Sequence, residues 1–152
     1  MIDADVQATA ERARPRGRIL LIDDNESFRA SVRAILEHAG YDVDEAGDGR
    51  EALHKYSERP ADLIITDMVM PGMNGMETML EVWRDYPQAR FIAMSGSVHA
   101  FNTEFNLECA REFGALHTFT KPIEREPFLS AVAQALGNGR ESPDAAIGAG
   151  PS

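Results

Sequence analysis

The sequence predicts an α/β fold in which a five-stranded parallel sheet lies between two layers of helices. The first observation is that short apolar runs alternate five times along the chain with amphipathic segments of helical period. The second is that "LLI", "LII" and "FIAM" are apolar throughout, which is typical of strands buried on both faces of a sheet. Right-handed crossovers between successive strands then place helices on both faces, which defines a doubly wound, three-layer α/β/α fold.

The predicted strands occupy residues 18–23, 41–46, 62–67, 90–95 and 116–120. The second of them, "YDVDEA", alternates polar and apolar residues with the period of two that is typical of a strand. Five βα units within residues 17–137 suit the flavodoxin-like strand order 2-1-3-4-5. In that order, ligands lie beyond the carboxyl ends of the strands, beside the switch point that strands 1 and 3 flank.

The predicted helices follow the strands, at residues 25–40, 48–59, 75–86, 103–114 and 124–136. Gly40 and Gly114 stand where two of the helices end, and Asp48 is a candidate N-cap. Apolar residues three or four positions apart predict which side chains pack on the sheet. The expected stripes are Phe28, Val32, Ile35 and Ala39 in the first helix, Met76, Met79, Leu80 and Trp83 in the third, Phe105, Cys109 and Phe113 in the fourth, and Phe128, Val132 and Ala135 in the fifth.

Composition and charge narrow the classes of function. The chain has 152 residues, a formal net charge of −10 and one cysteine, Cys109, which we expect to be a buried thiol. An acidic surface repels a phosphate backbone, so nucleic-acid binding is not expected. No apolar run approaches the roughly 20 residues of a membrane span, and the N-terminus lacks the apolar core of a secretory signal, so we expect a cytoplasmic protein. Residues 1–16 and 138–152 have the composition of flexible tails, which leaves residues 17–137 as the folded domain.

Polar residues stand at the carboxyl ends of four predicted strands. Asp23 and Asp24 end the first, Asp67 ends the third, Ser95 ends the fourth and Lys121 follows the fifth. Taken singly, each has an ordinary interpretation as a helix cap, a turn residue or a surface lysine. Together they converge on one edge of the sheet, where crowded carboxylates raise each other's pKa unless a cation relieves the repulsion.

The residue types at this edge favour phosphoryl chemistry. Carboxylate oxygens on loops suit Mg²⁺, which commonly pairs with phosphate. Asp67 is then a candidate nucleophile that forms an aspartyl phosphate. Lys121 and Ser95 are candidates to hold the remaining phosphoryl oxygens through hydrogen bonds.

Four motifs carry a resemblance to a known family. They are "LLIDDN", "DMVMPGMNG", "AMSGS" and "TFTKP", which stand in this order on the first, third, fourth and fifth predicted strands. With them the sequence resembles the receiver domains of bacterial two-component response regulators, over about residues 17–137. The resemblance implies that Asp67 is the phosphoacceptor, with Ser95 and Lys121 as its catalytic partners.

The resemblance also implies a metal site and a backbone feature. Asp24 is expected to bind Mg²⁺ directly and Asp23 mostly through water, with Asp67 and the backbone carbonyl of Val69 as further ligands. The Lys121–Pro122 peptide bond is expected to be cis, the one kind of peptide bond for which cis is accessible at low cost. Pro71 and Gly75 are expected to shape the turn after Asp67, where a glycine can adopt a positive φ.

The sequence departs from the family at two positions. Many receivers have Tyr or Phe three residues before the lysine as a switch residue, whereas this chain has Thr118, and Phe119 next to it is expected on the opposite face of the strand. A polar side chain two residues after the acceptor helps some receivers to place the hydrolytic water. Val69 has no hydrogen-bonding group, so slower loss of phosphate is a hypothesis. A relay through the loop that contains His99 is an alternative to the aromatic switch.

The function expected from the resemblance is phosphorelay signalling. A sensor histidine kinase or histidine phosphotransfer protein would supply the phosphoryl group, and the chain, a monomer or weak dimer, would signal by contact with an unidentified downstream protein. It would not be an enzyme beyond its own phosphorylation and dephosphorylation. The sequence contains no output domain after the short tail, so a stand-alone receiver is expected.

Other classes of function remain open at this point. A Mg²⁺-dependent phosphatase with an Asp nucleophile would need a second Asp two residues after Asp67, where this chain has Val69. A flavin- or nucleotide-binding module would need a loop rich in Gly, Ser or Thr after the first strand, where this chain has "DDNESF". An adaptor that does not bind phosphate is disfavoured because every residue of the expected site is present.

Overall fold

The computed structural model describes residues 16–96 and 100–137. The strands are β1 (Arg18–Ile22), β2 (Asp42–Ala46), β3 (Leu63–Asp67), β4 (Phe91–Ser95) and β5 (His117–Thr120). The helices are α2 (Glu26–His38), α3 (Gly49–Glu58), α4 (Gly75–Asp85), α5 (Ala100–Phe113) and α6 (Arg125–Ala135). Within the described residues the predicted alternation of five strands and five helices is therefore confirmed.

The five strands form one parallel sheet in the order β2-β1-β3-β4-β5, as predicted. In the register of the sheet, Ile22 of β1 pairs with Thr66 of β3, and Asp67 pairs with Met94 of β4. Because all the strands point the same way and end at similar heights, the residues that follow them gather at one edge.

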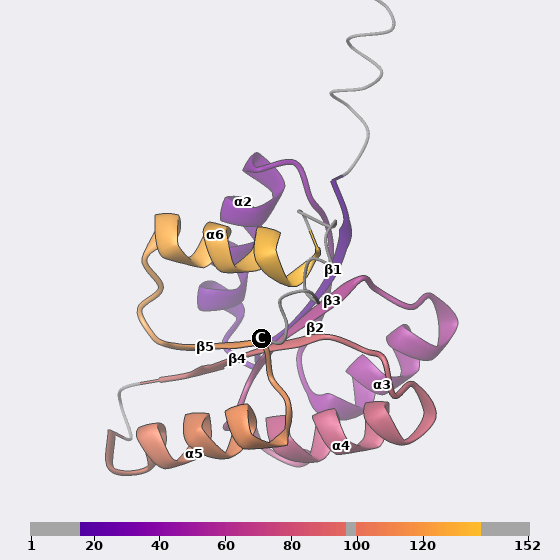
Figure 1. Cartoon of the computed structure of the whole chain (residues 1–152), viewed down its shortest axis with the longest axis vertical. Helices are drawn as coiled ribbons and strands as arrows, with labels where there is room; N and C mark the ends of the chain where they lie inside the picture. The colour runs from indigo at the N-terminus through magenta and orange to yellow at the C-terminus, as the bar shows by residue number, and fades with distance from the viewer. Residues whose placement is uncertain (1–15, 97–99, 138–152) are drawn as a thin grey trace, which may run out of the picture.

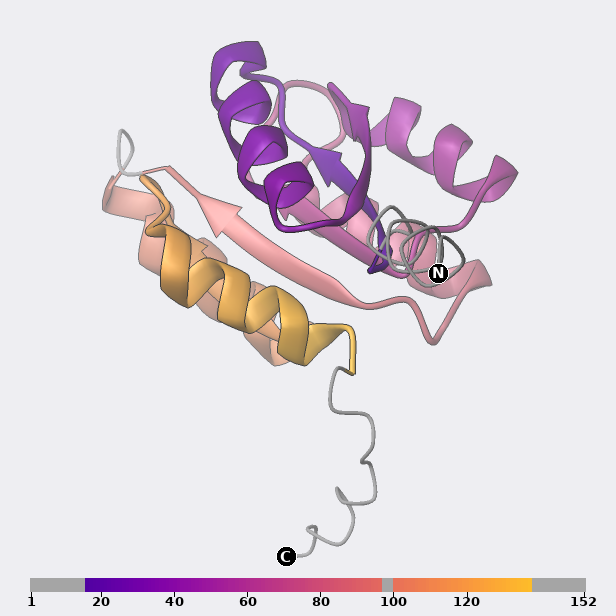
Figure 2. The same cartoon turned by 90° about the horizontal axis from the view of Figure 1, so that it is seen from above.

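Helices cover both faces of the sheet. Figure 1 shows α2 and α6 above the sheet and α3, α4 and α5 below it, and Figure 2 shows α2 and α6 side by side in the upper layer. Successive strand residues point to opposite faces, so Ile19 and Leu21 pack with α2 and α6, whereas Leu20 and Ile22 pack with α3, α4 and α5. The two hydrophobic cores that result fix the sheet between two layers, which holds the strand ends in place.

Side-chain caps begin three of the helices. Asn25 accepts a hydrogen bond from the backbone N–H of Phe28, and Asp48 accepts one from that of Glu51. At α4, Asn74 and Glu77 each accept a hydrogen bond from the other's backbone N–H, which is a capping box. These caps satisfy N–H groups that have no partner inside the helix. The prediction of Asp48 as an N-cap is confirmed.

The predicted apolar stripe of the fourth helix is largely wrong. In α5, Phe105 is 65% exposed and Phe113 is 56% exposed, while Leu107 and Ala110 are buried. Cys109 is only partly buried rather than enclosed. The helix packs against β4 and β5 at the edge of the sheet, where only a narrow stripe is covered, and that stripe is rotated away from the two phenylalanines.

The other stripes are closer to expectation. Phe128, Val132 and Ala135 of α6 are buried as predicted, and so is Met79 of α4. Leu80 is an exception, because 45% of it is exposed. In α2 the buried residues are Val32 and Leu36, and the predicted Phe28, Ile35 and Ala39 pack beside them as partly buried neighbours.

The described residues begin at Arg16, one residue before the predicted boundary. The backbone N–H of Arg16 donates to the carbonyl of Gly40 at 2.8 Å, and its guanidinium lies over the ring of Tyr41. Residues 1–15 and 138–152, which include most of the two predicted tails, lie outside the described residues, so the division into a domain and tails stays a prediction. Among the described helices, none has the length and apolarity that a membrane span requires.

Candidate functional site

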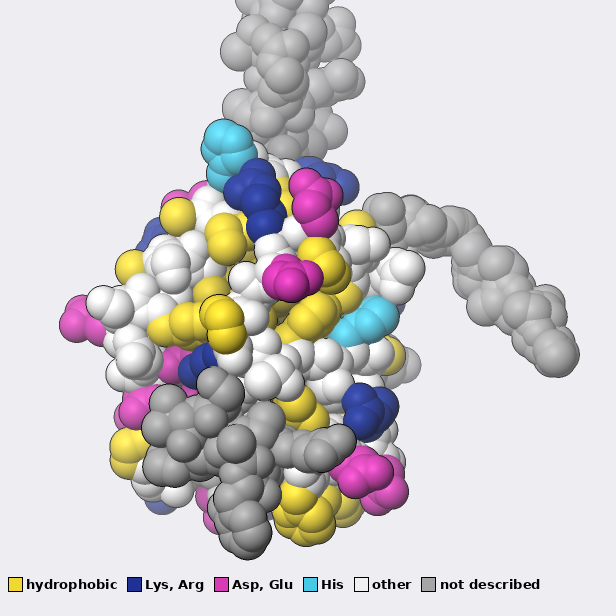
Figure 3. Space-filling view, turned by 90° about the vertical axis from the view of Figure 1, so that its left-hand side faces the viewer, with side chains coloured by type: hydrophobic (Ala, Val, Ile, Leu, Met, Phe, Trp, Pro, Cys, Tyr) yellow, Lys and Arg dark blue, Asp and Glu magenta, His cyan; other side chains and the backbone are white. Residues whose placement is uncertain are grey.

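The candidate site lies at the carboxyl ends of the strands. Figure 3 shows this face of the molecule, on which hydrophobic side chains gather among scattered acidic and basic ones. A cavity of about 530 Å³ opens here, and Asp67, Ser95 and Lys121 are among the residues that line it. The cavity therefore brings together residues from β3, β4 and the segment after β5, as the sequence predicted.

Asp67 occupies the centre of the site. It ends β3, a strand in which every residue is buried, and it is itself only 5% exposed. The Thr66 hydroxyl donates to the Asp67 carbonyl at 2.9 Å, and the N–H of Met68 donates to Met94 of β4. The backbone on both sides of the carboxylate is thus held by the sheet, which fixes the direction of the side chain.

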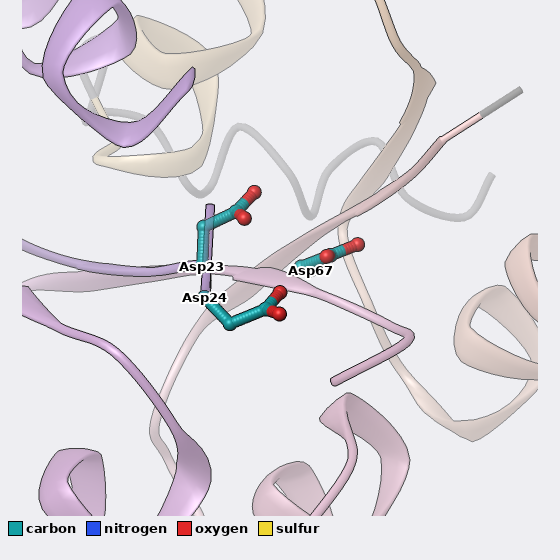
Figure 4. Close-up of side chains that lie close together, drawn as sticks. All are labelled: Asp23, Asp24 and Asp67. Carbon is teal, nitrogen blue, oxygen red and sulfur yellow. The ribbon is translucent and has the colours of Figure 1, made fainter. Parts of the chain in front are cut away.

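Asp23 and Asp24 bring two further carboxylates to the same point. Figure 4 shows their side chains and that of Asp67 converging from neighbouring strand ends, and one ligand oxygen from each lies within 4.8 Å of the others. Asp23 is fully buried and accepts a hydrogen bond from the N–H of Asn25 at 2.9 Å, whereas Asp24 is exposed. Such a set of hard oxygen ligands fits a divalent cation such as Mg²⁺.

Lys121 supplies a positive charge to this cluster. Its Nζ lies 2.7 Å from Oδ2 of Asp23 and 3.3 Å from Oδ2 of Asp67, so it bridges the two buried carboxylates. The ammonium also lies 4.3 Å from the centre of the Phe28 ring, a cation–π contact that confines it further. The N–H of Lys121 donates to the carbonyl of Ser95, and the Lys121–Pro122 bond is cis, as expected from the family.

The lysine offsets only part of the electrostatic cost at Asp67. The pKa of Asp67 is raised from 3.8 to about 6, first by burial and then by the charge of Asp23, while Lys121 opposes both effects. Oδ1 of Asp67 is buried and has no hydrogen-bond partner among the described residues. A buried carboxylate oxygen without a partner costs free energy, so the site is prepared for a cation or an electrophile at that atom.

Arg29 supports the site from behind. Its Nη1 donates to the carbonyl of Asp23 and its Nε donates to Oε1 of Glu45, both at 2.6 Å. The same Glu45 forms an ion pair with Arg33. Hydrogen bonding from Arg29 is the largest cause of the lowered pKa of Glu45. Arg29 has no signature in the sequence, because an arginine on an amphipathic helix carries no signal of what it contacts in the fold.

Two glycines shape the turn after Asp67 for different physical reasons. Gly72 has a φ of +75°, a conformation that favours glycine. Gly75 does not have a positive φ, contrary to the predicted reason for a glycine there. A Cβ at Gly75 would instead lie 2.3 Å from the Asp67 carbonyl oxygen and 2.8 Å from Cα of Met68. Gly75 is therefore needed because the start of α4 approaches the acceptor strand closely.

The remaining predicted residues have different environments. Val69 lines the cavity and is 47% exposed, so it lies at the mouth. Thr118 does not line the cavity. Its hydroxyl accepts a hydrogen bond from Arg111 of α5 at 2.7 Å. Phe119 packs on the opposite face, edge-on to Phe128, as predicted from strand alternation. His99 lies outside the described residues.

The cavity includes residues that the sequence did not single out, among them a residue of α5. Asn106 of α5 lines it together with Asp67, Ser95 and Val69. A single asparagine within a helix gives no signal of function, and its position depends on the rotation of the helix, which the sequence predicted incorrectly.

Comparison with known proteins agrees with this geometry. The model of the response regulator receiver domain matches residues 19–133. The chemotaxis protein CheY of Thermotoga maritima is 39% identical over 116 residues, which is 76% of this chain and 93% of that protein. Protein CcdB of Bacillus subtilis is 32% identical over 122 residues, 80% of this chain and 98% of that protein.

Solved structures show the same similarity. A receiver domain from Clostridium thermocellum has a TM-score of 0.73 at 28% identity, over 81% of this chain and 96% of that one. The Vibrio cholerae chemotaxis protein CheY4 has a TM-score of 0.68 at 30% identity, over 81% of this chain and 99% of that one.

The chain belongs to the response regulator receiver domain family of two-component systems. It has the CheY-type fold of that family, and its cluster of Asp23, Asp24 and Asp67 fits the Mg²⁺ binding of receiver domains. Receiver domains are in general signalling domains rather than enzymes, and their partners are histidine kinases or phosphotransfer proteins.

Proposed function

We propose that this chain accepts a phosphoryl group on Asp67 from a phosphohistidine and passes the signal on by contact with another protein. The observation that carries the proposal is the state of Asp67. It is a buried carboxylate at a strand end, with a pKa of about 6 and one oxygen that has no partner among the described residues. At pH 7 most of it is ionised and able to act as a nucleophile.

The transfer needs no residue beyond those at the site. An oxygen of the Asp67 carboxylate attacks phosphorus, an O–P bond forms as the P–N bond breaks, and the histidine nitrogen of the donor keeps the electron pair of that bond. Lys121, whose Nζ is 3.3 Å from Oδ2 of Asp67, lies close enough to hold a phosphoryl oxygen. Ser95, 1% exposed and lining the same cavity, would donate its hydroxyl to another.

A divalent cation completes the charge balance. Asp23, Asp24 and Asp67 would hold Mg²⁺, and the backbone carbonyl of Val69 would be a fourth protein ligand. When bound, Mg²⁺ neutralises charge on the phosphoryl oxygens. The protein's own part is to keep the three carboxylates together, which the sheet and the N–H of Asn25 do.

Hydrolysis by water returns the phosphorylated protein to its resting state. Attack of water on phosphorus breaks the O–P bond, releases inorganic phosphate and restores the Asp67 carboxylate. This is turnover of the chain's own phosphate and not catalysis on an external substrate. Val69 cannot act as a general acid two residues after the nucleophile, so the phosphatase alternative gains no support from the site.

Labelling with a small phosphodonor tests the proposal. With acetyl phosphate and Mg²⁺ we expect a mass gain of one phosphate (~80 Da) on the intact protein, with none in Asp67→Asn and a much weaker gain in Asp24→Asn. Asp85→Asn is a matched control, because this aspartate is an exposed residue at the end of α4. Retention of the label in Asp67→Asn, or no label on the wild-type chain, would contradict the proposal.

A further inference from the structure

We propose that Asn106, on α5, positions the water molecule that hydrolyses the aspartyl phosphate, and thereby sets the lifetime of the phosphorylated state. The inference rests on the function proposed above and goes beyond it, because it assigns to a residue of the fourth helix a step that neither Lys121 nor Ser95 performs.

Asn106 lies in the outer part of the cavity. Asn106 lines the same cavity as Asp67, Ser95 and Lys121, although it comes from a helix and not from a strand end. Ser95 and Asp67 are 1% and 5% exposed and lie deep in the site, whereas Asn106 is half-buried and Val69 is 47% exposed. Asn106 and Val69 therefore line the outer part of the cavity, on the side from which water enters.

The carboxamide of Asn106 is available to a ligand. No hydrogen bond recorded between residues of the described ranges uses the side chain of Asn106. Asn25 and Asn74, by contrast, both use their side chains as helix caps. An amide that lines the cavity without serving as a helix cap is able to bind water or a ligand.

The position of Asn106 also matches the direction from which the attacking water must approach. Hydrolysis requires water to approach phosphorus opposite the Asp67 oxygen that leaves, because displacement at phosphorus is in line. That approach starts at the mouth of the cavity. A carboxamide has an acceptor oxygen and two donor hydrogens, so it can accept from the water and donate to a phosphoryl oxygen at the same time. Val69 shares the mouth and has no such group.

The rotation of α5 holds Asn106 in this place. Leu107 and Ala110 are the buried residues that fix the helix on the sheet. Asn106 and Ala110 are four positions apart and thus lie on one side of the helix. The amide is carried on a packed element and not on a mobile loop, which is what orientation of a water molecule requires.

The test compares the half-life of the phosphate in matched variants. Each variant is labelled with acetyl phosphate and Mg²⁺, the donor is removed, and loss of the ~80 Da mass gain is followed in time. We expect Asn106→Ala to lengthen the half-life roughly 3- to 10-fold, the effect of one lost hydrogen bond in the transition state. The rate of labelling and the affinity for Mg²⁺ should stay within about twofold, because neither uses this water.

Two further variants separate positioning from a structural role. Glu108→Ala changes an exposed residue of the same helix and should leave the half-life unchanged. Val69→Asn in the Asn106→Ala background returns a carboxamide to the mouth from the opposite side and should restore part of the lost rate. Far-ultraviolet circular dichroism on every variant shows that the fold is kept.

The outcomes distinguish the two proposals. If the wild-type chain is labelled at Asp67 and Asn106→Ala loses phosphate at the wild-type rate or faster, the inference fails and the phosphoacceptor function stands. If the wild-type chain takes no label, both fail. A longer half-life in Asn106→Ala that Val69→Asn shortens again supports the inference.

Discussion

The central and edge strands of the sheet differ in how completely they are buried. Every residue of β3, in the middle, is buried, whereas no residue of β5, at the edge, is fully buried. Beside β5, Phe113 and Leu116 expose about half of their surface, at 56% and 48%. The same five-stranded sheet thus has a fully enclosed core strand and a partly uncovered edge.

The difference follows the chemistry. Asp67 must hold its carboxylate against two like charges, so it stands on the strand with the most complete support on both faces. The edge strand carries no carboxylate of the site. Its apolar neighbours Phe105, Phe113 and Leu116 are exposed on or beside α5. The centre of the sheet holds the site in a fixed geometry, and the edge leaves apolar surface exposed.

The largest expected effect is a difference in unfolding free energy between truncating a buried phenylalanine of the sheet and truncating an exposed one beside its edge. Phe91 of β4 is fully buried and stacks edge-on against Trp83 at 5.1 Å, so Phe91→Ala should lower the free energy of unfolding by about 4 kcal/mol. Phe113→Ala removes a ring that is 56% exposed and should cost less than about 1 kcal/mol. Urea unfolding measures both. Similar losses for the two variants would show that the edge is packed as tightly as the centre.

The next effect concerns the turn after Asp67. Gly75→Ala places a Cβ 2.3 Å from the Asp67 carbonyl oxygen, so backbone at the site must move. We expect a loss of about 3 kcal/mol in unfolding free energy, together with a loss of labelling by acetyl phosphate. Gly72→Ala is the matched control, since a Cβ there meets nothing within 4 Å and only the positive φ opposes it, at about 1 kcal/mol. A Gly75→Ala protein that labels normally would contradict the close-approach argument.

The sequence predicts the centre well because simple physics dominates there. An uninterrupted apolar run such as 63–65 favours a strand buried on both faces, and parallel strands bring their carboxyl ends together. The convergence of Asp23, Asp24, Asp67, Ser95 and Lys121 follows from strand order alone, without any knowledge of side-chain geometry.

The sequence predicts the edge less well because spacing does not determine which side of a helix is covered. Phe105, Cys109 and Phe113 are four positions apart, as a buried stripe would be, yet the helix turns Leu107 and Ala110 to the sheet. Asn106 enters the cavity as a consequence of that same rotation. Gly75 was identified, but with the wrong reason, since a close approach between two backbone segments has no local sequence signature.

The smallest of these effects is the pH-dependent loss of stability that the ionised Asp67 carboxylate causes at the centre of the sheet. The pKa of Asp67 in the folded protein, about 6, is above its ordinary value of 3.8, so the folded state binds the proton more tightly than the unfolded state. The stability that protonation provides is fully present below pH 3.8 and is lost as the pH rises through 6. We therefore expect Asp67→Asn to be more stable than the wild type at pH 7 by about 2 to 3 kcal/mol, and equally stable near pH 4.

Glu45, which Arg29 connects to the backbone of Asp23, has a pKa shift of the opposite sign. Its pKa is lowered, first by the hydrogen bond from Arg29, so its ionised form stabilises the fold above pH 4.5 and that contribution is lost as the pH falls through the lowered pKa. Glu45→Gln should thus be less stable than the wild type at pH 7.

Saturating Mg²⁺ should stabilise the wild type at pH 7 and have a much weaker effect on Asp67→Asn, because the cation relieves the repulsion that the substitution removes. If Asp67→Asn were no more stable than the wild type at pH 7 without Mg²⁺, the Asp67 carboxylate would not destabilise the folded state. The centre and the edge of the sheet would then differ only in how completely their side chains are packed.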